Sequence, residues 1–242
     1  MSHEDAKLAV REMVWSRLDQ SGVAHPPGAA GRIPNFVGAE AAAERLASHP
    51  SWQRAGVIKC NPDKAQLPVR LLALAEGKRL YMAVPRIADI QPFYLLDPRN
   101  LTDRPERIVT SEGAARHAPK VGVGEMPPVD LVICGSVAVN RDGARIGKGA
   151  GYSDIEVALL TEAGLVSPST ILATTVHPLQ IVNGPIPEAA HDFRVDLIVT
   201  PNEIVECPPA HRPAGLYWDS LDPAKVAAIP VLAARAATRS KT

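Results

Sequence analysis

The chain has 242 residues, of which 26 are Lys or Arg and 26 are Asp or Glu, so its formal net charge is zero. This balance excludes the global basic field of sequence-independent nucleic-acid binders, while the length is sufficient for the single domain that we predict over residues 1–242. The three cysteines are widely separated, which argues against a disulfide framework or a zinc site and favours a reducing, cytoplasmic setting.

The N-terminal segment predicts an amphipathic helix over residues 3–20, with acidic residues in its first turn. Four apolar residues at i, i+4 spacing form one stripe: Ala6, Val10, Val14 and Leu18. The neighbouring stripe carries Lys7, Arg11 and Trp15. No window approaches the ~20 apolar residues that a membrane span requires, and the N-terminus lacks a signal-type apolar stretch, so we expect an untargeted protein without a membrane partner.

The following segments alternate between strand-like and helix-like patterns. A loop rich in Pro and Gly is expected at residues 23–35, and an Ala-rich helix at residues 39–48. Strands are predicted at residues 56–59, 80–84, 131–134, 170–176 and 195–199, and helices at residues 67–75, 155–163 and 223–236. Residues 97–120 are polar and charged and predict an irregular excursion. The alternation predicts an α/β fold with a mainly parallel central sheet and helices on both faces.

A cationic glycine loop follows the strand predicted at residues 131–134. In the run RIGKGAGYSD, residues 145–154, the glycines alternate at positions 147, 149 and 151. Glycine lacks a Cβ, so its backbone amides can approach an anion closely, and Arg145 and Lys148 add positive charge. Because a helix is predicted immediately behind the loop, its N-terminus favours phosphate oxygens. We interpret the loop as a phosphate cradle, with a simple flexible turn as the alternative.

Ser153 and Glu156 have the S-x-x-E spacing of a capping box, which predicts that they begin the helix behind the loop. On this basis both residues, together with Asp154, have an ordinary helix-start interpretation beside any functional one. The loop matches neither the G-x-x-x-x-G-K-[ST] pattern nor a clean G-x-G-x-x-G after a first strand. The motif therefore predicts neither a P-loop nor a Rossmann site.

The loop at residues 145–154 resembles the signature of the 5-formyltetrahydrofolate cyclo-ligases, also called methenyltetrahydrofolate synthetases. Lys7 and Arg11 have the spacing with which that family places two phosphate-binding cations on its first helix. On an isolated helix the same pair is also compatible with solvated charge.

A second region, VHPLQIVNGPIPEAAHDFRVDLIVTP, is similar to the family's glutamine segment and to the aspartate-containing block that follows it. It contains Gln180, Asp192 and Asp196. Asp196 also has a structural interpretation at a strand end, and His177 favours a turn or hydrogen-bonding role over proton transfer. Three motifs thus occur in the family's order along the chain.

The resemblance implies a cyclo-ligase fold of the NagB/RpiA/CoA-transferase-like architecture, with ATP and Mg²⁺ as cofactors. It implies a nucleotide site formed by Lys7, Arg11, Arg145, Ile146, Gly147, Lys148, Gly149, Ala150, Gly151 and Tyr152. Lys148 and Arg145 would be catalytic, and Asp154 and Asp192 would hold Mg²⁺, although the helix dipole alone could favour Asp154. Tyr152, Asp63 and Gln66 would contact the substrate.

The implied reaction is phosphorylation of an N-formyl oxygen by ATP, followed by ring closure to 5,10-methenyltetrahydrofolate. Such chemistry needs positioning and charge neutralisation more than a nucleophilic side chain. Gln66 stands where the family has Thr, Asp63 where it has Glu, and Ser153 where it has a second aromatic residue. The missing ring removes a face on which a folate could stack.

Three hypotheses follow for the function. The first is an ATP- and Mg²⁺-dependent ligase of folate and one-carbon metabolism with a folate-like small-molecule substrate. The second, motivated by the changes at Asp63, Gln66 and Ser153, is a nucleotide-binding paralog with another substrate, for example a thiamin-related one, or a regulatory role. The run GKGAGYSDIE also resembles such a paralogous branch, the cyclo-ligase-domain proteins. The third is an RNA-associated protein, which only the Arg-rich segment at residues 99–116 supports. The sequence assigns no oligomeric state.

Overall fold

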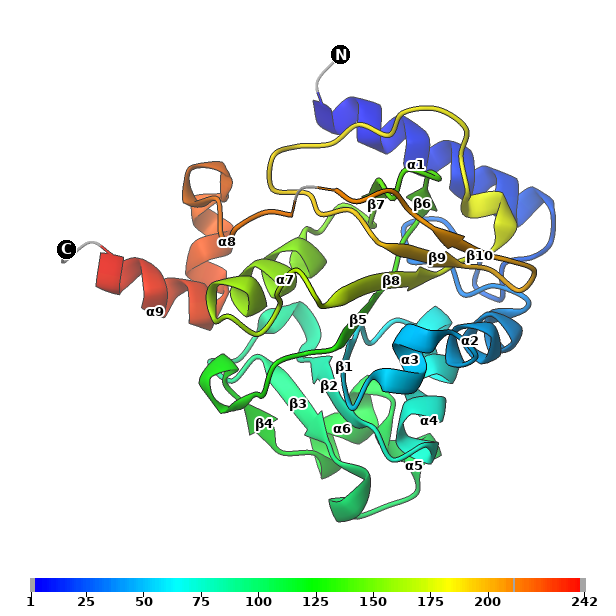
Figure 1. Ribbon diagram of the computed structural model, residues 1–242. Helices are drawn as coiled ribbons and strands as arrows, with labels where there is room; N and C mark the ends of the chain where they lie inside the picture. The colour runs from blue at the N-terminus through cyan, green and yellow to red at the C-terminus, as the bar shows by residue number, and fades with distance from the viewer. Residues whose placement is uncertain (1–2, 211, 240–242) are drawn as a thin grey trace.

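The computed structural model describes residues 3–210 and 212–239 and has a central eight-stranded sheet with helices on both faces (Figure 1). The strand order is β10-β9-β8-β5-β1-β2-β3-β4. The strands of this sheet are β1 (Val57–Cys60), β2 (Arg79–Ala83), β3 (Phe93–Leu96), β4 (Lys120–Val121), β5 (Leu131–Cys134), β8 (Ile171–Thr175), β9 (Leu197–Val199) and β10 (Ile204–Glu206). The five strands from β9 to β2 are parallel, whereas β10, β3 and β4 pair antiparallel at the edges.

The helices of the described residues divide between the two faces of the sheet. They are α1 (His3–Gln20), α2 (Ala39–Ala47), α3 (Pro50–Arg54), α4 (Leu67–Ala75), α5 (Pro105–Ile108), α6 (Ser111–His117), α7 (Tyr152–Glu162), α8 (Pro223–Ala228) and α9 (Pro230–Arg239). Alternate strand residues point to opposite faces, so Ile133 packs in the core beneath α2 and α4 while Val132 packs with Val157 of α7. This two-sided burial explains why the central strands read as continuous apolar runs.

The strand order reverses direction between β1 and β5. The chain passes from β1 to β2 on one side, then returns to place β5 on the other side of β1 and continues outward through β8 and β9. In open α/β sheets, ligands bind in the crevice at the carboxyl ends of strands at such a reversal. Residues 61–63, which follow β1, and Gly135, which follows β5, line a cavity at this edge of the sheet.

Helix α1 packs on a small antiparallel hairpin formed by β6 (Ala138–Val139) and β7 (Arg145–Ile146). Val14, Trp15 and Leu18 bury the C-terminal half of the helix against this hairpin. The predicted helix at residues 3–20 is confirmed, but the predicted apolar stripe is only partly right. Ala6 and Val10 are half-buried, whereas the cations of the neighbouring stripe are buried, because the N-terminal half of α1 faces a polar cavity.

Several other predictions need correction. Residues 97–120 are not irregular, because they contain α5, α6 and β4, which form short packed elements around Ile108 and Ala114. The single helix predicted at residues 223–236 is two helices that break at Pro230, where the proline ring cannot continue the hydrogen-bond ladder of α8. Short strands β3, β4, β6, β7 and β10 were not predicted. Among the described helices, none has the length and apolar character that crossing a bilayer requires.

Candidate active site

Two cavities meet at the glycine loop, residues 147–151. The α1 cavity, of about 380 Å³, lies between α1, the loop, the start of α7 and the segment at residues 215–225. The β1 cavity, of about 610 Å³, lies over the carboxyl ends of β1, β2 and β5. Four residues line both cavities: Arg145, Gly147, Gly151 and Asp154. The loop and Arg145 are therefore the common wall of two compartments.

Helix α1 carries two buried cations into the α1 cavity. Lys7 Nζ lies 2.5 Å from Asp192 Oδ2, and its side chain is 5% exposed. Arg11 Nε donates to the carbonyl oxygen of Gly147 at 2.8 Å, so its position fixes the loop. Burying charges is costly unless they are paired, and both cations have a partner. The spacing predicted for Lys7 and Arg11 thus places them side by side at one cavity.

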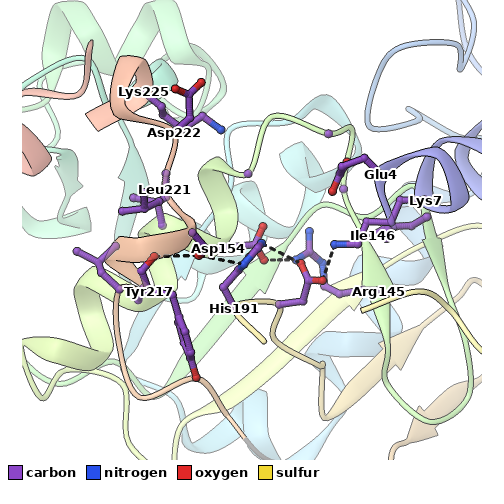
Figure 2. Close-up of a pocket in the computed structure, with 18 of the residues that line it drawn as sticks. Glu4, Lys7, Arg145, Ile146, Asp154, His191, Tyr217, Leu221, Asp222 and Lys225 are labelled. Atoms are coloured by element: carbon purple, nitrogen blue, oxygen red, sulfur yellow. Dashed lines mark hydrogen bonds and ion pairs between the residues drawn. The ribbon is translucent and has the colours of Figure 1, made fainter. Parts of the chain in front are cut away.

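Arg145 is buried at the boundary of the two cavities (Figure 2). Its Nη1 lies 3.2 Å from Asp154 Oδ1, its Nη2 donates to the carbonyl oxygen of Gly135 at 3.3 Å, and its guanidinium stacks 4.5 Å from the ring centre of Phe193. Its Nε has no hydrogen-bond partner among the described residues. Burial raises the pKa of Asp154, and Arg145 opposes that effect.

The glycine loop depends on backbone angles that other residues rarely adopt. Gly149 has φ +98° and Gly151 has φ +67°, and a Cβ on Gly149 would lie 3.4 Å from the Arg11 guanidinium. Lys225 Nζ of α8 donates to the carbonyl oxygen of Ala150 at 2.9 Å. Cations from both ends of the chain therefore hold carbonyl oxygens of the loop. Since C=O and the following N–H point in opposite directions in a trans peptide, the amides of residues 148 and 151 point away from these cations.

The predicted capping box at the start of α7 is wrong. The N-cap is Gly151, and no side chain caps the helix. Ser153 Oγ instead accepts a hydrogen bond from Asn61 Nδ2 at 2.7 Å, and Glu156 forms an ion pair with the fully buried Lys59. The two side chains are thus bound by Asn61, which follows β1, and by Lys59 of β1. Without Glu156, Lys59 would be a buried charge without an acidic partner.

The predicted substrate residues lie at the β1 cavity in different ways. Asp63 and Tyr152 line it, and Lys148 lies at its rim with its Nζ 3.9 Å from Asp63 Oδ1. Gln66 has no exposed surface and donates to Thr175 Oγ1 at 3.1 Å, so the structure does not bring it to the cavity wall. Ile146 lines the α1 cavity, and Ala150 lines the β1 cavity.

Three residues that support the site were not selected from the sequence. Lys59 lies in β1, and Arg70 in α4 donates to the backbone carbonyls of Asn61 and Asp63 at 2.5 and 3.0 Å, which shapes the turn at the floor of the β1 cavity. Phe193 supports Arg145. Lys59 and Arg70 could have been found from the sequence, because each is a charged residue within a predicted apolar strand or helix.

The remaining candidates have structural contacts. Gln180 donates to the Ser136 carbonyl oxygen at 2.8 Å, and His177 Nδ1 accepts from the Leu179 amide at 3.1 Å, as a turn role predicts. Asp196 accepts from the Leu172 amide at 2.7 Å at the start of β9. Burial raises the pKa of the Cys60 thiol to about 11, so this cysteine is not an activated nucleophile.

Comparison with known proteins identifies the family. The model of the 5-formyltetrahydrofolate cyclo-ligase family matches residues 5–201, which include the glycine loop and both cations of α1. The chain belongs to this family. It is 36% identical over 236 residues to a methenyltetrahydrofolate synthase domain-containing protein of Bos taurus, with 94% of this chain and 61% of that protein covered. The human protein of the same name is 34% identical over 233 residues, with 94% and 60% covered.

The chain spans about three fifths of the length of those curated relatives. A solved structure, the 5,10-methenyltetrahydrofolate synthetase of Aquifex aeolicus, has the same fold, with a TM-score of 0.54, 18% sequence identity, and coverage of 87% of this chain and 95% of that one. The predicted family and the predicted mainly parallel α/β fold are therefore both confirmed.

Proposed function

We propose that the protein is an ATP- and Mg²⁺-dependent ligase of the cyclo-ligase type that acts on 5-formyltetrahydrofolate or a closely related N-formyl compound. The observation that carries this proposal is the pair of cavities with a common wall at Arg145 and the glycine loop. A reaction that moves a phosphoryl group between two substrates needs the two to meet at one cationic boundary.

The α1 cavity is the proposed nucleotide compartment. Lys7, Arg11 and Arg145 give it three cations, and two of them are paired with Asp192 and Asp154. A bound triphosphate would take over Lys7 and Arg145 as partners, which would free the two carboxylates. Lys7 and Arg145 would therefore have an anionic partner both before and after binding.

The same carboxylates fit Mg²⁺. This ion prefers oxygen ligands and is commonly held by one or two carboxylates together with substrate phosphates. Asp154 and Asp192 line the same cavity and are close enough for the charge of Asp192 to raise the pKa of Asp154. The described residues contain no group of three or more His, Cys, Asp or Glu that could hold a metal ion, so phosphate oxygens would complete the ligand set. Bound Mg²⁺ would neutralise charge on the phosphates.

The β1 cavity is the proposed formyl-substrate compartment. Arg145 at the common wall can hold the phosphoryl group during transfer from nucleotide to formyl oxygen. Lys148 at the rim supplies a further cation that is free to move, since its side chain is 47% exposed. The other folate nitrogen then attacks the formyl carbon, a C–N bond forms, and the phosphorylated oxygen leaves as phosphate, so no side-chain nucleophile is needed.

Thermal unfolding with MgATP tests the nucleotide part of this proposal. At ~100 times its dissociation constant, a ligand stabilises the folded state by roughly 2.7 kcal/mol, which corresponds to about 5–10 °C for a domain of this size. We expect this increase in the unmutated protein and a clearly smaller one in Lys7→Ala and Asp154→Ala. The surface variant Arg141→Ala serves as the control, because its Arg pairs with Glu203 in solvent. An unchanged midpoint in the unmutated protein would exclude the nucleotide site.

A further inference from the structure

The wall of the α1 cavity opposite α1 comes from a part of the chain that the family model does not include. The match to the family ends at residue 201, whereas residues 215–225 lie further along the chain and line the cavity. Figure 2 shows Tyr217, Leu221 and Lys225 on one side of the cavity, with Glu4, Lys7 and Arg145 on the other.

The two sides differ in chemistry. The α1 side carries Lys7, Arg11 and the glycine loop. The opposite side includes the polar residues Ser220, Asp222 and Lys225 and a group of apolar and aromatic residues: Ile155, Ala158, Leu216, Tyr217 and Leu221. A nucleoside triphosphate has the same division, since its phosphates are anionic and its base is a flat ring with little charge. A cavity with one cationic end and one apolar end complements such a ligand along its whole length.

The apolar side is held in place from two directions. Leu216 and Leu221 pack against a buried cluster that includes Ile155, Leu159 and Ile229. On the other flank, Lys225 Nζ donates to the Ala150 carbonyl oxygen and lies 5.8 Å from the centre of the Tyr152 ring. The segment is therefore anchored both to α7 and to the glycine loop, which fixes the distance between the apolar surface and the cationic end.

We propose that residues 215–225 form the nucleobase subsite of this chain, with Tyr217 and Leu221 as the surface that contacts the base. This inference rests on the proposed function, because it takes the phosphates of the same nucleotide to lie at Lys7, Arg11 and Arg145. It adds that base recognition comes from a segment outside the family's matched region. Base–aromatic stacking strengthens binding of a nucleotide substantially, so this subsite makes a large contribution to affinity.

The test compares MgATP with magnesium tripolyphosphate, which carries the phosphates without the base. Isothermal titration of the unmutated protein is expected to show at least tenfold tighter binding of MgATP. In Tyr217→Ala/Leu221→Ala, the Kd for MgATP is expected to rise about tenfold while that for tripolyphosphate changes less than twofold. Tyr217→Phe keeps the ring and should bind MgATP like the unmutated protein. The control is Trp218→Ala, because this neighbouring aromatic residue does not line the cavity and instead stacks on Arg239.

Each outcome has one meaning for the subsite. An unchanged Kd for MgATP in the double variant, with the unmutated protein binding both ligands, would overturn the subsite and leave the phosphate site intact. Equal weakening of both ligands, with a lowered melting temperature, would also overturn it, because the segment would then be structural. Absence of binding of either ligand to the unmutated protein would remove the proposed function and the subsite with it.

Discussion

Arg145→Gln is expected to lower kcat/KM with MgATP by about 100- to 1000-fold, the cost of removing one preorganised donor from a developing negative charge. Arg145 is the cation of the wall common to both cavities, and its position is fixed by Asp154, the Gly135 carbonyl and Phe193. Arg145→Lys keeps the charge but loses the planar fork and the stacking on Phe193, so it should recover only a small part of the activity.

Stability measurements on the same variants separate chemistry from folding. Arg145→Gln leaves the half-buried Asp154 without its cation, and since desolvation already raises the pKa of that carboxyl, protonation will limit the cost. We expect a loss of no more than about 3 kcal/mol. Arg145→Gln/Asp154→Asn should regain most of that stability but none of the activity. Normal turnover in Arg145→Gln would contradict the assigned role, and Arg141→Gln, in an exposed ion pair, is the matched control.

Lys59→Met is expected to destabilise the fold by about 3–5 kcal/mol, because it leaves Glu156 as a buried carboxyl without a partner. Lys59 has no exposed surface, and its Nζ contacts both Glu156 and, at 2.6 Å, Asn61 Oδ1. Burial raises the pKa of Glu156 and the charge of Lys59 opposes that effect, so loss of Lys59 is expected to raise the pKa of this carboxyl further.

The double variant Lys59→Met/Glu156→Leu tests whether the pair acts as a unit. Replacing both partners of a buried ion pair by apolar residues is often nearly neutral, so we expect the double variant to be more stable than Lys59→Met alone. Urea unfolding of the four proteins in the cycle gives the coupling energy. Additive effects of the two single changes would show that the ion pair does not stabilise the junction of β1 and α7.

The sequence predicted the central elements well and the contacts of the charged residues less well. Strand β5 and helices α1 and α4 have the predicted bounds, because their apolar periodicity and end signals are strong. Ser153 and Glu156 matched a local capping pattern, yet their partners Asn61 and Lys59 lie more than 90 positions away in the chain. The local spacing of residues does not show which distant residue will bind a side chain.

The candidate site was likewise predicted only in part. The structure places Lys7, Arg11, Arg145, Asp154 and Asp192 at one cavity. Three other residues that the resemblance assigned to the nucleotide, Lys148, Ala150 and Tyr152, line the β1 cavity and not the α1 cavity. Gln66 was selected because it stands where the family has Thr, three residues after Asp63. At the turn into α4, however, Asp63 lines the β1 cavity whereas Gln66 is fully buried. Lys225 could not be selected, because its bond to the glycine loop depends on how the C-terminal helices fold back onto α7.

Turnover of 5-formyltetrahydrofolate is the most direct test of the two-cavity account. Incubation of the protein with 5-formyltetrahydrofolate, ATP and Mg²⁺ is expected to produce the methenyl chromophore and ADP in a one-to-one ratio. Arg145→Gln should abolish both products together, since the same residue faces both cavities. Absence of the chromophore and of ADP, under conditions in which an authentic cyclo-ligase forms both, would contradict the account and leave a nucleotide-binding paralog with a different substrate.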